Sequence, residues 1–316
     1  MSSNEGPMIV ACATDAAYFE HCAAMLASLI EFNPGVEVRV LCDEDVSDEL
    51  RETLTAWGRE RGARIHCIAP KLDLPENMPG LRSLTRAAWL RLFLPDLFPQ
   101  TSRILYLDVD LIVRESLQEL WSAQLRGHWL AAVHDVRVSY TPIPHEMRLG
   151  LPPGSTYFNS GVLVMDLVAL RRENVRAAAL RFAAEKPQLI RHADQDPLNV
   201  LLQERRLPLH LRWNVQAALY ENEAASDQPF SANEIQDAMK RPAIVHYCGP
   251  WKPWHYRSRH PLRHLYARYR AQTPWPEWEQ EGRTFKHRVL RLMPEYMARW
   301  LSHTYWTVRN AVRPEW

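Results

Sequence analysis

The N-terminal part of the chain alternates between short apolar runs and stretches with helical periodicity. Residues 8–13 are continuously apolar, and the segment that follows repeats apolar side chains at helical spacing across residues 22–30. Residues 36–42 and 63–68 predict two further strands, and Ser47 is placed to cap the helix between them. This strand–helix–strand rhythm predicts an α/β domain with a mostly parallel sheet flanked by helices.

The middle of the chain contains its most strand-like run. Residues 103–113 are apolar apart from Arg103 and two central aspartates, Asp108 and Asp110. The helical pattern of residues 84–94 is expected to end at Pro95. Further strands are expected at residues 129–133, 162–165 and 243–247, and further helices at residues 167–185 and 194–202.

Two segments lack this alternation. Residues 137–154 are rich in proline and have no clear period, and connections of this length are uncommon unless they act as lids or binding loops. Residues 256–316 are basic, aromatic and helix-prone. The chain is therefore expected to consist of a body, residues 1–255, and a helical C-terminal extension, residues 256–316.

The C-terminal extension carries apolar and basic side chains at helical spacing. The apolar positions are Phe285, Val289, Leu292, Tyr296, Trp300 and Leu301, and the basic ones include Lys286, Arg288, Arg291 and Arg299. A helix of this kind suits an anionic membrane surface. It suits a position packed against the body equally well, and the sequence leaves both alternatives open.

Composition and charge narrow the classes of protein and partner. Hydrophobic residues make up 47% of the 316 residues and charged residues 24%, as in ordinary globular proteins. Lys and Arg total 38 against 37 Asp and Glu, so we expect no nucleic-acid partner. The five cysteines are scattered, and neither a signal peptide nor an apolar run of about 20 residues is visible. We expect a cytoplasmic protein, either free or peripheral on the inner face of the membrane.

Asp108 and Asp110 carry the first chemical signal. Alternate residues of a strand point the same way, so these two carboxylates can face one point in space. Two buried like charges are costly unless a cation lies between them, and oxygen ligands suit Mg²⁺ or Mn²⁺. The alternative is that both are solvated loop residues, because an Asp-x-Asp pair is common by chance.

A second signal lies in residues 246–254, a turn that carries His246 and Lys252. A neutral imidazole can join two carboxylates on a metal, and an ammonium group suits a phosphate. The alternative is a core histidine beside an exposed lysine. The glycine-rich loops G-x-G-x-x-G and G-x-x-x-x-G-K-[ST] do not occur in the sequence, which argues against a dehydrogenase or a P-loop enzyme.

Three shorter motifs complete the set, at residues 14–15, 157–161 and 194–196. The first follows a predicted strand, where its side chains could hydrogen-bond the edge of a nucleotide. The second places small residues after an asparagine, which permits close approach of a ligand. The third stands at a predicted helix start, where Asp194 and Asp196 can also act simply as helix charges.

In this order, the motifs resemble glycosyltransferase family 8, which has the GT-A fold, and within it bacterial lipopolysaccharide α-galactosyltransferases and glucosyltransferases. The resemblance covers residues 8–255 and implies a GT-A catalytic domain over residues 1–255. It implies that Asp108, Asp110 and His246 bind Mn²⁺ or Mg²⁺. The donor-binding positions that it implies are Ala13, Asp15, Tyr18, Arg91, Asp108, Val109, Asn159, Ser160, Gly249 and Lys252. The catalytic positions that it implies, next to the donor sugar, are Asp135, Asp194 and Gln195.

The activity implied by the resemblance is retaining transfer of a hexose, galactose or glucose, from a UDP-sugar to a glycan or lipid-linked glycan such as lipopolysaccharide. One departure concerns Ala17, which stands where close relatives often have an asparagine that touches the donor. Two alternatives stay open: a catalytically weak nucleotide-sugar-binding protein and a metal-dependent nucleotidyltransferase. The choice between double displacement and a same-side substitution also stays open.

Overall fold

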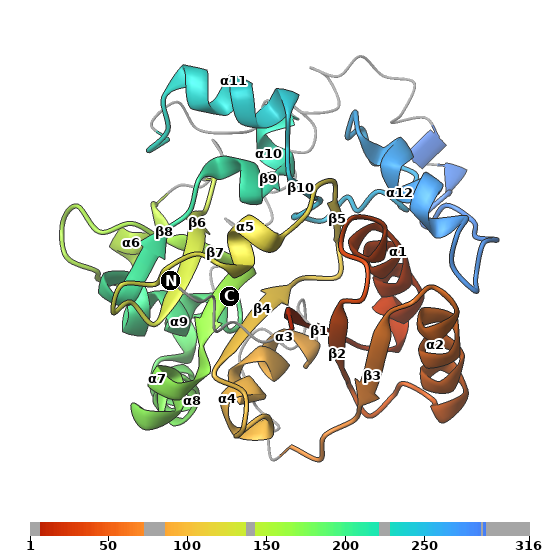
Figure 1. Ribbon diagram of the computed structural model, residues 1–316. Coiled ribbons are helices and arrows are strands. Elements are labelled where there is room, and N and C mark those ends of the chain that lie inside the picture. Colours follow the sequence, from red (N-terminus) through yellow and green to blue (C-terminus); the bar gives the residue numbers. More distant parts are fainter. Residues whose placement is uncertain (1–6, 73–85, 137–142, 221–227, 286, 289–316) are drawn as a thin grey trace.

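A seven-stranded sheet forms the centre of the computed structural model, which describes residues 7–72, 86–136, 143–220, 228–285 and 287–288. Its strands lie in the order β3-β2-β1-β4-β7-β6-β8 (Figure 1). Pairing is parallel from β3 to β4 and between β6 and β8, whereas β7 runs antiparallel to both of its neighbours. The strands are β1 Ile9–Thr14, β2 Glu37–Cys42, β3 Arg64–Ile68, β4 Arg103–Leu107, β6 Leu130–His134, β7 Phe158–Asp166 and β8 Arg206–Pro208.

A smaller three-stranded sheet lies beside the first and consists of β5 Leu111–Val113, β10 Ile244–His246 and β9 Val215–Gln216, with β10 in the middle. The prediction of one strand over residues 103–113 is therefore wrong. The backbone N–H of Asp108 still donates to Gly161 of the large sheet, while the carbonyl of Asp110 already accepts from Tyr247 after β10. The chain changes sheets within these three residues, which places both aspartates where the two sheets meet.

Helices cover both faces of the large sheet, because successive side chains of its central strands point to opposite sides. Leu105 and Leu107 pack towards α1 and α2, whereas Ile104 and Tyr106 pack towards α3, α8 and α9. The predicted α/β class with a mostly parallel sheet and flanking helices is confirmed. The helices are α1 Ala16–Phe32, α2 Asp48–Glu60, α3 Ala87–Leu90, α4 Leu94–Leu97, α5 Gln118–Trp121, α6 His145–Arg148, α7 Leu167–Arg172, α8 Val175–Glu185, α9 Gln195–Leu202, α10 Ala217–Tyr220, α11 Ala232–Lys240 and α12 Arg263–Arg270.

Two predicted helix boundaries differ from the structure. Helical conformation continues past Pro95 to Leu97, because Pro95 lies in the first turn of α4, where its missing N–H needs no partner. The single helix predicted over residues 167–185 is two helices, since Asn174 adopts a left-handed φ of 49° between α7 and α8. By contrast, the predicted N-cap is confirmed, because Ser47 accepts a hydrogen bond from the backbone N–H of Leu50.

The described part of the predicted C-terminal extension packs on the body (Figure 1). α12 lies against α1, where Tyr266 and Tyr269 join the hydrophobic core. The buried guanidinium of Arg270 pairs with Glu20. Residues 289–316, which hold most of the predicted amphipathic pattern, lie outside the described residues. Within the described ranges, no helix combines the length and apolar character needed to cross a membrane.

Candidate active site

Asp108, Asp110 and His246 converge at the junction of the two sheets. His246 ends β10, and its Nε2 lies 3.2 Å from Oδ1 of Asp110 and 3.8 Å from Oδ2 of Asp108. One ligand atom from each residue falls within 4.8 Å of the others. Two carboxylate oxygens and an imidazole nitrogen are a donor set that suits Mn²⁺ and also accommodates Mg²⁺. The residues predicted to bind a metal are therefore brought together, with Asp110 and His246 buried and Asp108 partly open to solvent.

Lys252 adds a positive charge to this cluster. Its ammonium group pairs with Asp110 and donates to the carbonyl of Tyr247 at 3.1 Å. Burial raises the pKa of Asp110, but Lys252 and His246 outweigh it and hold that pKa well below its usual range. Gly249 permits the turn that brings Lys252 back, because its φ of 92° is one that other residues rarely adopt.

Arg91 links the metal cluster to the helix α9. Its guanidinium lies 3.0 Å from Asp108 and 2.9 Å from Asp194, and it stacks over the ring of Tyr106 at 4.3 Å. Burial raises the pKa of Asp194 to about 7, although Arg91 acts in the opposite direction. Arg91 also donates to Ser160, so one buried cation holds together two predicted donor-binding positions, Asp108 and Ser160, and the predicted catalytic Asp194.

Asp135, Asn159 and Gln195 form a hydrogen-bonded group beside Arg91. Oδ2 of Asp135 accepts from the side-chain amides of Asn159 at 2.9 Å and Gln195 at 3.3 Å. Oε1 of Gln195 accepts from the backbone N–H of Ser160 at 2.8 Å and from its hydroxyl at 3.2 Å. Burial raises the pKa of Asp135, and the two amide donors lower it in part. The three predicted catalytic positions are thus held together, since Asp194 directly precedes Gln195.

The positions predicted to bind the nucleoside lie at the end of β1. Ala13 is buried there, and Asp15 caps α1 through a 2.9 Å hydrogen bond from the backbone N–H of Tyr18. The ring of Tyr18 meets Trp254 edge-on at 5.5 Å, and Trp254 stacks on His21 at 3.8 Å. Burial raises the pKa of the Tyr18 phenol, an effect that Lys252 opposes and Asp110 reinforces. Val109 is buried between the two aspartates.

Asp196 is fully buried and accepts several hydrogen bonds, whereas the sequence also allowed it to be a simple charge at the start of a helix. One carboxylate oxygen accepts from Arg148 at 2.7 Å and from the hydroxyl of Tyr157 at 2.8 Å. The other accepts the backbone N–H groups of Arg191 and His192, both ahead of α9. Asp196 therefore fastens α6, in the loop predicted to be a lid, to the helix that carries Gln195. Residues 137–142 of that loop lie outside the described residues.

Sequence reasoning missed two further residues of this region, His21 and Asn214. Nδ1 of His21 lies 2.6 Å from the hydroxyl of Tyr266, which comes from α12. Asn214 is fully buried, with Oδ1 lying 2.8 Å from Nδ1 of His246. Neither belongs to a local motif, and each acquires its position through contacts with distant segments.

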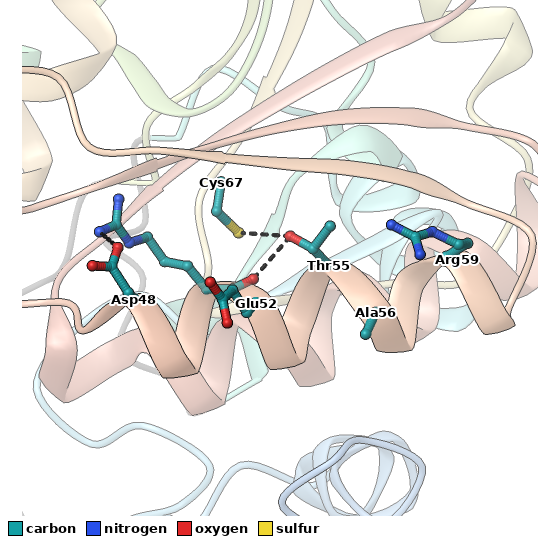
Figure 2. A pocket seen from close by; sticks show the side chains of 7 residues that line it. Asp48, Glu52, Thr55, Ala56, Arg59 and Cys67 are labelled. Atoms are coloured by element: carbon teal, nitrogen blue, oxygen red, sulfur yellow. Dashed lines mark hydrogen bonds and ion pairs between the residues drawn. The ribbon is translucent and has the colours of Figure 1, made fainter.

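An open hollow of about 360 Å³ lies along α2, is bordered by Cys67 of β3, and is separate from this site (Figure 2). Arg51 and the well-exposed Asp48 pair within it, and the thiol of Cys67 faces the hydroxyl of Thr55 at 3.8 Å. None of the residues that line it belongs to the groups described above. Its lining consists mainly of charged side chains on the surface of α2.

Comparison with known proteins gives consistent matches. Residues 9–258 match the sequence model described as glycosyl transferase family 8. General stress protein A of Bacillus subtilis is 29% identical over 284 residues, which cover 87% of this chain and 96% of that protein. Lipopolysaccharide 1,3-galactosyltransferase of Salmonella typhimurium is 26% identical over 260 residues, or 80% of this chain and 75% of that protein.

A solved structure also matches over most of the chain. The galactosyltransferase LgtC, crystallised with donor and acceptor sugar analogs, superposes with a TM-score of 0.72 and 24% identity. The match covers 84% of this chain and 96% of that one. At this level of identity the likeness shows the fold, and the predicted GT-A arrangement is confirmed.

Proposed function

Because this chain belongs to glycosyltransferase family 8, we propose that it transfers galactose or glucose from a UDP-sugar to a glycan acceptor, with retention at the anomeric carbon. The observation that carries the proposal is the convergence of Asp108, Asp110 and His246 beside Lys252. These three ligands would hold Mn²⁺ or, with the same oxygen-rich set, Mg²⁺. When bound, the cation would supply positive charge to the diphosphate leaving group.

The residues around the cluster have roles that follow from their positions. Lys252 pairs with Asp110 in the structure, so its ammonium group lies at the metal cluster, where it would bind a diphosphate oxygen. Gly249 sets the turn that keeps Lys252 close. We assign the nucleoside to the end of β1, where Ala13, Asp15 and Tyr18 lie, with Val109 between the metal ligands.

The sugar would lie against Asp135 and α9. Departure of UDP leaves positive charge on the sugar ring, and we assign its stabilisation to the carboxylates of Asp135 and Asp194. The amide oxygen of Gln195 already accepts two hydrogen bonds from Ser160, which weakens it as a nucleophile. This arrangement favours a same-side substitution over a double displacement through Gln195. Arg91 and Asn159 keep the carboxylates in position.

The acceptor that we propose is a glycan or a lipid-linked glycan such as lipopolysaccharide. The support is the name of one relative, a lipopolysaccharide 1,3-galactosyltransferase. Such an acceptor would place the enzyme at the inner face of a membrane, where the basic and aromatic residues after Phe285 could contact anionic lipid. The described part of the extension packs on α1, so the membrane contact would fall to residues beyond it.

Product analysis tests this proposal against its alternatives. The protein is incubated with Mn²⁺, an α-linked UDP-hexose and a lipo-oligosaccharide acceptor, and the new linkage is read by NMR. An α-linked product supports retaining transfer, and a β-linked product contradicts it. Tight UDP binding without any transfer indicates a nucleotide-sugar-binding protein. Formation of UDP-hexose and pyrophosphate from UTP and hexose-1-phosphate indicates a nucleotidyltransferase instead.

A further inference from the structure

His246 meets the metal site with one ring nitrogen and a buried asparagine with the other. Nε2 faces the two aspartates, while Nδ1 lies 2.8 Å from Oδ1 of Asn214. Asn214 precedes β9, which pairs in parallel with β10, and its side chain is fully buried. The contact therefore joins two neighbouring strands of the small sheet on the side of the imidazole that is turned away from the cluster.

The orientation of the Asn214 amide follows from a backbone group that can only donate. The N–H of Gly161 lies 2.9 Å from one side-chain atom of Asn159, so that atom must be the oxygen. The same oxygen lies 2.8 Å from Asn214, which must present its NH₂ group there. The oxygen of Asn214 therefore faces His246, and an oxygen without a hydrogen can only accept.

We infer that Asn214 is a positioning residue that keeps the proton of neutral His246 on Nδ1, so that the lone pair of Nε2 points at the metal. The inference rests on the proposed metal-dependent function. Reversing any one link would set two acceptors or two donors face to face inside the protein. The orientation of both amides is thus set by a backbone N–H group of β7, the strand that also carries Asn159 and Ser160 of the proposed donor site.

The chain of contacts continues to the sugar side. Because Asn159 uses its oxygen for Gly161 and Asn214, its NH₂ group is left to donate to Asp135. The side-chain amide of Asn159 therefore donates to Asp135, a proposed catalytic residue. Through Asn214, the same amide also fixes the direction of the hydrogen bond to His246, a proposed metal ligand. Histidine ligands commonly have such an outer partner, whose loss weakens metal binding about 10- to 100-fold.

Two substitutions separate the accepting role of Asn214 from its bulk. Asn214→Leu keeps the size of the side chain and removes the acceptor. Asn214→Asp keeps an acceptor for the imidazole N–H and loses only the NH₂ group that donates to Asn159. Asn33→Leu is the matched control, because Asn33 is also buried and makes two hydrogen bonds, to Leu29 and Leu117, away from the site. The first readout is the affinity for Mn²⁺ in the presence of UDP, measured by electron paramagnetic resonance.

The second readout is the Nδ1 proton of His246, observed by NMR in histidine-labelled protein that is loaded with Mg²⁺ and UDP. We expect a slowly exchanging proton on Nδ1 in the wild type and in Asn214→Asp. Asn214→Leu should lose this proton signal and bind Mn²⁺ about 10- to 100-fold more weakly. Asn33→Leu should resemble the wild type in both readouts.

Several results would overturn the inference: wild-type affinity in Asn214→Leu, or no slowly exchanging Nδ1 proton in the wild type or in Asn214→Asp. If Asn214→Leu does not fold, the wild type and Asn214→Asp decide through the NMR signal, which must be present in both. A wild type that binds UDP but no Mn²⁺ overturns the metal-dependent function and this role for Asn214 together. A wild type that binds Mn²⁺ with UDP while Asn214→Leu binds it equally well overturns the role of Asn214 alone.

Discussion

Gly161 on β7 lies directly against His246. A β-carbon at position 161 would stand 2.3 Å from Cε1 of the imidazole and 2.7 Å from a carboxylate oxygen of Asp108. Both distances are below the 3.0 Å that real β-carbons respect. The space in which two metal ligands approach each other is therefore the space left by the missing side chain of this glycine.

Gly161→Ala should displace His246 and Asp108 and weaken Mn²⁺ binding about 10- to 100-fold, as other disturbances of ligand placement do. Titration calorimetry with Mn²⁺ in the presence of UDP measures this. Gly58→Ala is the matched control, because its β-carbon would meet Ile65 at 2.4 Å, far from the site. Both variants should lose stability, but only Gly161→Ala should lose metal affinity. Equal metal affinity in the two variants would contradict the geometry.

Arg91→Met should lower the free energy of unfolding by about 3–5 kcal/mol, because it leaves the buried carboxylate of Asp194 without its cation. Adding Asp194→Asn should recover part of the loss by removing that charge. Urea denaturation of the single and double variants measures both effects.

The control for this pair is Arg176→Met, which breaks a half-exposed ion pair with Asp96 and should cost less than about 1 kcal/mol. If Arg91→Met costs no more than Arg176→Met, the bridge between Asp108 and Asp194 does not stabilise the fold.

Lys252→Ala should weaken UDP binding in the presence of Mn²⁺ about 10- to 100-fold, the usual worth of a hydrogen bond between charged groups. Calorimetry with UDP and with uridine separates the contribution of the diphosphate, since uridine binding should not change. Lys186→Ala serves as the control, because Lys186 is exposed after α8 and lies over the ring of Phe182. An unchanged affinity for UDP in Lys252→Ala would contradict the diphosphate role.

The pattern of apolar residues was sufficient to predict the alternating strands and helices of the first 70 residues, and with them the α/β class. It failed at Asp108 and Asp110, because a continuous apolar run does not reveal that its two halves pair with different strands. The pairing partners of β5, which lie over 100 residues away, decide that change of sheet. The two aspartates do lie close together, as predicted, but the reason differs. They lie at a junction between two sheets and not on one extended strand.

The residues that hydrogen-bond the predicted site residues and orient them could not be predicted from the sequence. Asn214 contacts His246 because β9 and β10 pair, and Asp196 binds Tyr157 and Arg148 because α6 packs beside α9. Local patterns carry no information on such contacts between distant segments. A resemblance to a family supplies the residues expected to touch the donor, but the groups that orient those residues appear only when the chain is folded.

The stability of the protein should fall between pH 6.5 and pH 4 through buried histidines such as His260. Burial lowers the pKa of His260 to about 4, from an ordinary value of 6.5. Below pH 6.5 the unfolded chain binds a proton at His260 that the folded chain does not, so this part of the stability is present at neutral pH and lost on acidification. The expected slope is about 1.4 kcal/mol per pH unit.

Unfolding free energies of His260→Asn and wild type at pH 7.5, 6 and 5 isolate this effect. Asparagine preserves an acceptor for the backbone N–H of Leu262, which Nδ1 of His260 accepts at 3.1 Å in the wild type. The stability of the variant should fall less steeply with acidification, so that the two curves converge at low pH. Parallel curves would show that His260 titrates normally in the folded protein.

The most direct test of the central claim is the release of UDP from a panel of UDP-sugars, measured with Mn²⁺ and with EDTA. Wild type is compared with Asp110→Asn, which retains the shape of a metal ligand without its charge, and with the surface control Asp96→Asn. We predict that one UDP-hexose is turned over with Mn²⁺ by wild type and Asp96→Asn, and that EDTA or Asp110→Asn abolishes turnover. Turnover that is unaffected by EDTA and by Asp110→Asn would contradict a metal-dependent transfer at Asp108, Asp110 and His246.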